Sequence, residues 1–543
     1  MLSLAVTAPL FAPGYLLLRD AVSTPRSYLS DAALGLADAA PRALPQDFAV
    51  ALLSSVIDGG VAVKLLLAAG LWLAGWGAAR LAAVVVGDAG LAGQFVAATL
   101  AIWNPYVAER LLQGHWSLVV GYGCLPWVAA AMLRLREPEP GWADVGVLAF
   151  WTALAGLTPT GLMLAASVAV ACVFAPGSDW SRLRCAAIAL GTASIGALPW
   201  LTAAVVASSL APSQAEGVAV FAARAEPGLG TLGTLASLGG IWNADAVPAS
   251  RTTVFAVIAA IVLLGIVALG LPVAIRNRAA VPLLCLAAFA VVVPASMATG
   301  PGLAAVEATV RALPGLGVLR DAQKWVALAV PGYTLAGAAA VVTLRRRVPA
   351  VATALVCCAA LIATLPDLAW GVGGKVAPVV YPAGWSAVAA MINDDPRPVA
   401  VLPVDSMRRF AWAGDAPVLD PLPRWVHADV LSTGDLTIGG RTVPGEGERA
   451  RAVQQMLSDG ADRDQLANAG VGWVVVESGG AADTLGLPVA YHDDDITLYR
   501  VGGELPQATG RGVVLAAHFA WLALLLGGLA GLVWRTWGAR RRR

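Results

Sequence analysis

Long apolar runs separated by short polar connections fill most of the chain. A helix of about 20 apolar residues crosses the roughly 30 Å of hydrocarbon in a lipid bilayer. The pattern therefore predicts an all-α polytopic membrane bundle of about twelve transmembrane helices. The short pair around residues 158–160 (TPT) is open to a second interpretation, as one re-entrant hairpin. The expected spans are residues 2–18, 60–79, 91–104, 117–133, 143–157, 160–175, 185–207, 252–275, 279–299, 326–344, 349–370 and 512–534.

One long segment, residues 371–511, interrupts this pattern. It has a helical stretch at about 446–458, with apolar residues at helical spacing, and three short strand-like runs. The runs are residues 398–403 (PVAVLP), 472–477 (GWVVVE) and 496–501 (ITLYRV). We therefore expect a transmembrane module at 1–370, a small α/β domain at 371–511, and a last transmembrane helix with a basic tail at 512–543.

The composition favours a membrane protein and excludes several other classes. Of the 543 residues, 58% are hydrophobic and 13% are charged, whereas a soluble chain carries about 25% charged residues. The net charge of +1 provides no excess of Lys and Arg for a nucleic-acid partner. All six cysteines lie in apolar runs, which argues against disulfides and against a cysteine-based zinc site. The first apolar run lacks a basic start and a cleavage site, so we expect no cleavable signal peptide.

Clusters of Arg predict the orientation, because basic residues beside membrane spans tend to stay on the cytoplasmic side. If the tail at 540–543 is cytoplasmic, counting back through alternating spans puts every other Arg cluster on the same side. Those clusters lie at 80, 134–136, 182–184, 276–278 and 345–347. We therefore expect a multi-pass protein of the cytoplasmic membrane with both termini cytoplasmic. The connections expected outside are 19–59, 105–116, 208–251, 300–325 and 371–511.

The first outer connection places Asp20 directly after a span, at the boundary between membrane and water. This position suits a catalytic carboxylate, and it equally suits a helix-end carboxylate paired with a neighbouring Arg. Three more carboxylates follow in the same connection: Asp31, Asp38 and Asp47. We expect these three to be solvated, and Asp31 is the best substrate-binding candidate among them.

The second outer connection places Glu109, Arg110 and His115 between two spans, where uncompensated charge is costly. One interpretation is an anion pocket, in which Arg110 binds phosphate oxygens with its two-pronged guanidinium and His115 adds a donor. The other is an ordinary Glu–Arg pair inside a belt of aromatic residues at the membrane surface.

The fourth outer connection ends in Arg320, Asp321 and Lys324, at the mouth of the next span. Arg320 and Lys324 are four residues apart and so share one helical face. Two cations and a carboxylate at this depth suit the phosphate of a lipid headgroup. Long basic side chains that anchor a span at the membrane surface are the alternative.

With these residues in view, the membrane part of the chain resembles the GT-C superfamily of polytopic glycosyltransferases. It is most similar to actinobacterial membrane proteins related to mycobacterial arabinofuranosyl- and mannosyltransferases. The resemblance covers about two-thirds of the chain, and the second of its four motifs is the most specific. The motifs are residues 19–25 (RDAVSTP), 103–116 (WNPYVAERLLQGHW), 121–127 (GYGCLPW) and 320–324 (RDAQK).

The resemblance implies a glycosyltransferase that takes a sugar from a polyprenyl phosphate and adds it to a cell-envelope glycan or glycolipid. It implies that Asp20 is the catalytic base, because such enzymes use an acidic residue of the first outer loop. The substrate-binding candidates are then Asp31, Glu109, Arg110, His115, Arg320, Asp321 and Lys324. No DxD motif or adjacent acidic pair follows Asp20, so no cofactor is assigned and a divalent metal stays open.

A non-enzymatic alternative is a transporter of lipid or glycolipid, or a membrane scaffold that presents the segment 371–511. A transporter needs polar groups deep in its spans, whereas these spans hold almost no charge apart from Lys64, with His518 as the other exception. This favours a site at the outer mouth. We therefore expect the connections that carry Asp20, Arg110 and Lys324 to fold over one shared pocket.

Overall fold

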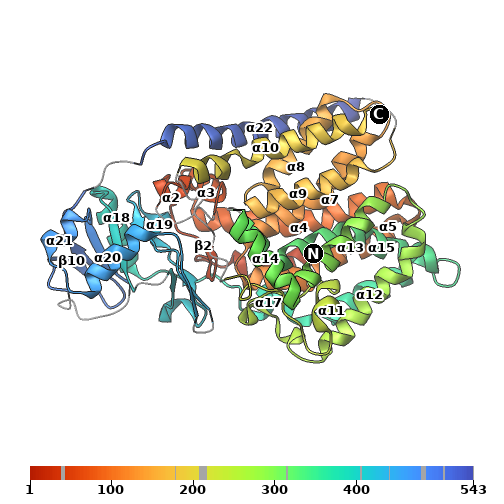
Figure 1. Cartoon of the computed structure of the whole chain (residues 1–543). Helices are drawn as coiled ribbons and strands as arrows, with labels where there is room; N and C mark the ends of the chain where they lie inside the picture. The colour runs from red at the N-terminus through yellow and green to blue at the C-terminus, as the bar shows by residue number, and fades with distance from the viewer. Residues whose placement is uncertain are drawn as a thin grey trace.

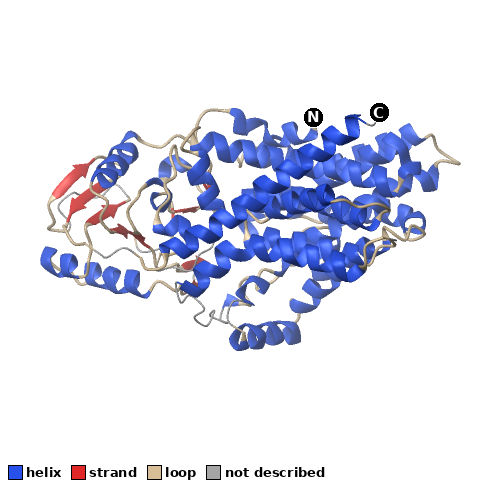
Figure 2. Cartoon of the chain, turned by 90° about the horizontal axis from the view of Figure 1, so that it is seen from above, coloured by secondary structure: helices blue, strands red, loops and turns tan. Residues whose placement is uncertain are grey.

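The computed structural model describes residues 1–37, 43–177, 179–206, 217–313, 316–403, 406–438, 441–477, 485–504 and 508–541. Long helices form a bundle, and a small α/β unit lies at one end of it (Figures 1 and 2). Asp38 falls outside the described residues.

The bundle is built from long helices that cross at close range. The longer ones are α4 (Gly59–Val85), α7 (Trp116–Arg136), α10 (Arg182–Val206), α12 (Phe255–Ala274), α13 (Val281–Met297), α15 (Ala329–Leu344) and α22 (Arg511–Arg541). Helix α4 packs against α7, α12 against α15, and α22 against α8 (Trp142–Ala155). A Cβ on Gly123 of α7 would lie 2.1 Å from the Gly70 carbonyl oxygen of α4. Small residues therefore let these backbones approach, as they do in many membrane bundles.

Among the described residues, six helices are long and apolar enough to cross a membrane. Two bent pairs raise this to eight: α13 with α14 (Gly300–Ala312), bent by 92°, and α16 (Ala350–Ala363) with the turn that follows it, bent by 75°. The prediction of about twelve spans is therefore not confirmed. Two of the remaining expected spans are α5 (Gly90–Ile102), of 13 residues, and α8, of 14. A third is α9 (Pro159–Val173), of 15 residues, which begins where Thr158 accepts a hydrogen bond from the Gly161 N–H.

The prediction of a first span at 2–18 is wrong. Helix α1 (Leu2–Thr7) and a 3₁₀ turn end at Phe11. Residues beyond it form a hairpin of β1 (Leu17–Leu18) and β2 (Ala21–Val22). The apolar side chains of this hairpin are buried in protein, so their hydrophobicity does not report a membrane span. Because the first helix has too few residues to cross about 30 Å of hydrocarbon, alternation of spans no longer fixes the side of the N-terminus.

The α/β unit contains a mixed five-stranded sheet with the order β10–β11–β9–β3–β6. Its strands are β3 (Val399–Leu402), β6 (Val430–Leu431), β9 (Trp473–Val476), β10 (Val489–His492) and β11 (Thr497–Arg500). Strand β3 runs parallel to β6 and β9, and β11 runs antiparallel to β9 and β10. The three strand-like runs of the sequence form β3, β9 and β11, and the expected helix is α20 (Glu448–Ser458). The other helices here are α18 (Ala383–Asp394), α19 (Leu422–Trp425) and α21 (Arg463–Asn468).

The N-terminal hairpin connects the bundle to the α/β unit. Leu17 and Val22 belong to the same buried apolar cluster as Trp385 of α18. The Arg19 N–H donates to the Pro417 carbonyl at 2.9 Å, and the Leu419 N–H donates to the Arg19 carbonyl at 2.9 Å. Leu419 is part of β5 (Val418–Leu419), which pairs with β4 (Met407–Arg408). Figure 1 shows β2 between the α/β unit and the bundle.

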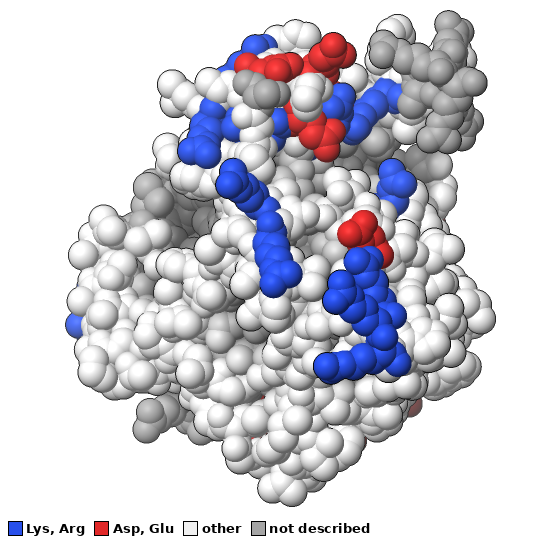
Figure 3. Space-filling view, turned by 90° about the vertical axis from the view of Figure 1, so that its right-hand side faces the viewer, with Lys and Arg blue, Asp and Glu red and all other residues white. Residues whose placement is uncertain are grey.

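The end of the bundle away from the sheet carries basic side chains. Figure 3 looks onto this end, and Lys and Arg side chains gather there with few carboxylates beside them. Helix α22 runs towards the same end from its start near the α/β unit (Figure 1). The sheet and the basic end therefore lie at opposite ends of the bundle.

Candidate functional site

Three of the connections that the sequence predicts to lie outside meet between the bundle and the α/β unit. Helix α6 (Pro105–Leu112) begins where the Asn104 side chain accepts a hydrogen bond from the Val107 N–H, with Pro105 at the first helical position. It ends at Leu112, and Gly114 in the turn that follows has a φ of +82°, which favours glycine. A Cβ at this position would lie 2.3 Å from the Leu18 carbonyl oxygen of the hairpin. Gly114 therefore lets the turn after α6 lie directly against the connection that holds Asp20.

Asp20 lies at the centre of this junction. Its Oδ2 atom accepts hydrogen bonds from Nε2 of Gln113 at 2.9 Å and from Nε2 of His115 at 3.0 Å. Among the described residues, no hydrogen bond engages Oδ1. The Asp20 side chain is 40% exposed. One oxygen is therefore held by the protein, while the other is left for a ligand.

The protonation of His115 follows from its two neighbours. Nδ1 of His115 lies 3.1 Å from Nη1 of Arg110, which can only donate. Nδ1 must therefore accept, and the proton of the neutral ring sits on Nε2, which donates to Asp20. Burial lowers the pKa of His115 below its ordinary value, against the hydrogen bond to Asp20, which raises it. The geometry and the pKa direction thus agree on a neutral imidazole.

Two further residues complete the network. Nη1 of Arg110 also donates to Oδ2 of Asp321 at 3.2 Å, and Nζ of Lys324 lies 3.3 Å from the same oxygen. Asp321 and Lys324 belong to the segment at the start of the 3₁₀ helix η7 (Ala322–Leu328). Arg110 has a fully buried side chain, whereas Lys324 is 24% exposed. The structure thus brings together Asp20, Arg110, His115, Asp321 and Lys324, and Lys324 is the cation of this set that reaches solvent.

The charge on Asp20 is stabilised by its surroundings. Burial alone would raise its pKa, but the hydrogen bonds from His115 and Gln113 and the charge of Lys324 lower it to about 2. Asp20 is therefore an anion at any physiological pH, with a neutral imidazole and a lysine beside it.

Glu109 points away from this network, although Arg110 follows it in α6. Its carboxylate accepts hydrogen bonds from the N–H groups of Gly240 and Ile241, at 3.0 and 3.2 Å, and from Nε2 of Gln323 at 2.8 Å. The side chain is fully buried. Glu109 therefore holds the connection around residue 240 and the helix η7 in place, and its contact with substrate stays a prediction.

The other two predicted substrate ligands also lie elsewhere. Asp31, at the start of α2 (Asp31–Leu34), forms an ion pair with Arg511 at the beginning of α22. Arg320 places its guanidinium 5.4 Å from the centre of the Phe221 ring and lines a small apolar cavity with Val218 and Met297. Among the described residues, these contacts are with partners other than Asp20, Arg110 and His115.

Sequence reasoning missed three contributors. Gln113 binds Asp20, Asn243 binds Gln113, and Arg19 donates to the carbonyl of Leu112 at 2.5 Å. Arg19 also adopts a φ of +50°, a strained value for a residue with a side chain, which its contacts to β5 maintain. Gln113 belongs to the recognised motif and could have been included. Asn243 stands in a connection without any motif, and no sequence signal marks it.

Comparison with known proteins adds evidence at the level of the fold. No family model matches the sequence, and no curated protein matches it. A solved structure does match. The fold is similar to that of a mycobacterial arabinofuranosyltransferase. The match is to a cryo-electron microscopy structure of a mutant of AftD, with a TM-score of 0.56 and 17% identity over 93% of this chain.

The chain spans 41% of the length of AftD, and at 17% identity the likeness concerns the fold. Together with the candidate membrane-spanning helices of the described residues, this similarity in fold supports a multi-pass membrane protein.

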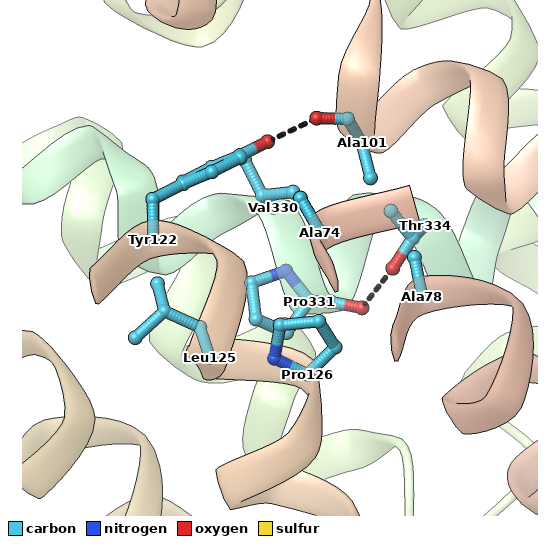
Figure 4. Close-up of a pocket in the computed structure, with 9 residues that line it drawn as sticks. All are labelled: Ala74, Ala78, Ala101, Tyr122, Leu125, Pro126, Val330, Pro331 and Thr334. Carbon is cyan, nitrogen blue, oxygen red and sulfur yellow. Dashed lines mark hydrogen bonds between the residues drawn. The ribbon is translucent and has the colours of Figure 1, made fainter. Parts of the chain in front are cut away.

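A second cavity, inside the bundle, offers fewer groups that could take part in a reaction. Figure 4 shows a cavity inside the bundle, where the Tyr122 hydroxyl donates to the Ala101 carbonyl and the Thr334 hydroxyl donates to the Pro331 carbonyl. Its lining carries no charged side chain. Within the described ranges, no three His, Cys, Asp or Glu side chains lie together as ligands of a metal ion would.

Proposed function

We propose that this protein is a GT-C-like membrane glycosyltransferase that moves a sugar from a polyprenyl phosphate to a glycan or glycolipid of the cell envelope. The observation that carries the proposal is the Asp20 network: a half-exposed carboxylate with one unengaged oxygen, beside a cation that reaches solvent. The similarity in fold to an arabinofuranosyltransferase supports the same class of reaction.

Asp20 would act as the base. As an acceptor hydroxyl attacks the anomeric carbon, its oxygen gains positive charge and its proton becomes far more acidic than that of a free alcohol. A carboxylate with a pKa of about 2 can therefore take this proton late in the reaction. Oδ1 is the oxygen available for it, because Oδ2 already accepts from Gln113 and His115.

Lys324 would stabilise the negative charge that grows on the departing lipid phosphate. It is paired with Asp321 and still 24% exposed, so a phosphate can reach it without leaving Asp321 buried alone. Arg110 would act indirectly, without touching the phosphate, because it is fully buried and holds His115 and Asp321 in place. This differs from the prediction that Arg110 itself binds the phosphate.

The reaction would take place at the outer face of the cytoplasmic membrane. The α/β unit (Figure 1) lies at the end of the bundle opposite the basic side chains (Figure 3), with the Asp20 network between the unit and the bundle, and basic residues favour the cytoplasmic side. The lipid tail of the donor would stay in the bilayer while its phosphate lies at the junction.

Cysteine labelling tests this orientation. In a variant with Cys285, the exposed native cysteine, replaced by Ser, Val489→Cys in β10 should react with an impermeant thiol reagent in intact cells. Arg278→Cys at the other end should react after permeabilisation only. The reverse pattern would contradict an outer-face site.

The function itself is tested by comparing the cell-wall glycans and glycolipids of a deletion strain with those of its parent. The proposal expects one sugar linkage to be missing and to return with the wild-type gene. Unchanged glycans and glycolipids, together with a redistributed lipid, would instead support a transporter.

A further inference from the structure

The connection between α10 and α12 contacts two neighbours of Asp20, Gln113 and Arg19. Nδ2 of Asn243 donates to Oε1 of Gln113 at 2.8 Å. Two residues later, the Asp245 carbonyl accepts a hydrogen bond from Nη2 of Arg19 at 2.9 Å. Gln113 in turn holds Asp20 twice, through its side-chain amide and through its carbonyl, which accepts from the Asp20 N–H at 3.2 Å.

The series of hydrogen bonds from Asp245 through Asn243 and Gln113 to Asp20 has one donor direction, in which each group donates to the next. The Asp245 N–H, a main-chain donor, donates to Oδ1 of Asn243 at 3.1 Å. Nδ2 of Asn243 must then face Gln113, and because it can only donate, it selects Oε1 of the Gln113 amide. Nε2 of Gln113 is left to donate to Asp20. A main-chain group thus fixes the direction of two side-chain amides in succession.

A reversed Gln113 amide would damage the site. Its Oε1 atom would face Oδ2 of Asp20, so that two acceptors would meet and Asp20 would lose a donor. With Oδ2 bound by Gln113 and His115, Oδ1 is the oxygen left for a hydroxyl; without that bond, either oxygen could turn towards it.

We propose that Asn243 is a positioning residue of this site, which fixes the orientation of Asp20 through the Gln113 amide. The inference rests on the proposed function only for the role of Asp20 as base. The charged and titratable groups that face Asp20 are Arg19, His115 and Lys324, and Asp245 and Arg409 in turn face Arg19.

Asn243→Asp tests the inference, because it keeps the acceptor for the Asp245 N–H and replaces only the donor. The new oxygen would face Oε1 of Gln113 and turn that amide round. We expect the kcat of sugar transfer to fall about 10-fold to 100-fold, the range for losing a hydrogen bond to a charged group. The assay uses membranes that contain the full chain and labelled polyprenyl-phosphate sugars.

Asn277→Asp is the matched control. Oδ1 of Asn277 likewise accepts from a main-chain N–H two residues on, that of Ala279 at 2.9 Å, and its Nδ2 donates to the Val85 carbonyl. It lies between α12 and α13, outside the Asp20 network, so transfer per folded chain should change less than about twofold.

A second readout does not depend on activity. Carbodiimides modify protonated carboxyl groups, so wild-type Asp20 should be labelled only slowly at pH 5, whereas loss of the Gln113 donor should raise the rate of labelling several-fold. Peptide mass mapping separates Asp20 from the new carboxyl at 243. In a Gln113→Ala background, Asn243→Asp should add less than about a twofold change to either readout, because the Gln113 side chain that links residue 243 to Asp20 is absent.

The outcomes separate the two proposals. Wild-type transfer and labelling in Asn243→Asp would overturn the role of Asn243 and leave the proposed function standing. A defect in Asn243→Ala alone would also overturn it, since Asn243 would then only cap the turn at 244–246. Altered labelling of Asp20 in a protein that transfers no sugar would uphold the positioning role and contradict the proposed function.

Discussion

Glu109 and Arg110 follow one another in α6 and belong to two polar clusters of opposite character. On the Glu109 side, Arg251 pairs with Glu226 and donates to the Ser237 hydroxyl at 2.7 Å, and every member is buried. On the Arg110 side, the network ends in Asp20, whose side chain is 40% exposed and has an unengaged oxygen.

The difference shows what separates a structural cluster from a candidate site. Both clusters contain arginine and carboxylates in a region where isolated charge is costly. The Glu109 cluster is enclosed in protein, where burial and the neighbouring Glu226 raise the pKa of Glu109 to about 8, and it fixes the connection around residue 240. The Arg110 cluster keeps one acceptor and one cation, Asp20 and Lys324, at the surface. Four predictions test this distinction.

The largest effect is expected for Asp20→Asn. The change keeps the size of the side chain and removes its charge and basicity, so transfer should fall about 10²–10⁴-fold with protein level unchanged. Complementation of a deletion strain, followed by glycan analysis, measures this. Asp31→Asn is the control from the same connection, because its partner Arg511 lies away from the network; it should restore the glycan.

Arg251→Met should act on stability instead. It leaves Glu226 buried without its partner, which costs about 3–5 kcal/mol in the free energy of unfolding. Less folded protein and a lower Tm are expected, with the transfer rate per folded chain close to wild type. A purified variant that is stable but inactive would place the Glu109 cluster in the catalytic site. The contrast between a structural Glu109 cluster and a catalytic Arg110 cluster would then be wrong.

Arg110→Lys should lower transfer about tenfold with normal expression. Lysine keeps the charge, but its side chain is shorter, so its nitrogen does not reach the position from which Nη1 of Arg110 contacts both His115 and Asp321. His115 would then be free to change tautomer and to stop donating to Asp20. Transfer at the wild-type rate would show that the order of this network is irrelevant to catalysis.

The smallest effect concerns pH. Because the pKa of Asp20 is lowered to about 2 and that of His115 is also lowered, transfer should show no inflection near pH 6.5. For stability, the contribution of ionised Asp20 is present above its unfolded pKa of about 3.9 and is lost as pH falls towards 2. Neutral His115 lowers stability as pH falls below about 6.5, because the unfolded state then binds a proton that the native state does not. An inflection in the rate at pH 6–7 would contradict the neutral imidazole.

Periodicity predicted much of the fold. The runs at 398–403 and 472–477 alternate little and are rich in Val, which is typical of strands buried on both faces, and they form β3 and β9. The run at 496–501 forms β11. The same reasoning failed at 2–18, because the apolar residues of the hairpin are buried in protein: Leu17 and Val22 lie in the core of the α/β unit, and Leu16 and Leu18 in that of the bundle. Hydrophobicity alone does not tell a lipid environment from a protein one.

The site was predictable where residues are close in sequence. Arg110 and His115 are joined by one helix end, and Asp321 and Lys324 by one turn. That Asp20 meets them depends on the hairpin, and that Glu109 faces away depends on the rotation of α6. Asn243 is 130 residues from Gln113. Such a contact is set by the packed fold and leaves no local pattern.

The most direct test of the central claim is transfer by the purified full chain in lipid nanodiscs. Labelled polyprenyl-phosphate pentoses and hexoses would be offered with glycan and glycolipid extracted from a deletion strain. We expect one sugar to be transferred by the wild-type protein, with release of an equal amount of polyprenyl phosphate, and no measurable transfer by Asp20→Asn. Equal transfer by both proteins, or no transfer of any sugar by the wild type, would contradict the account.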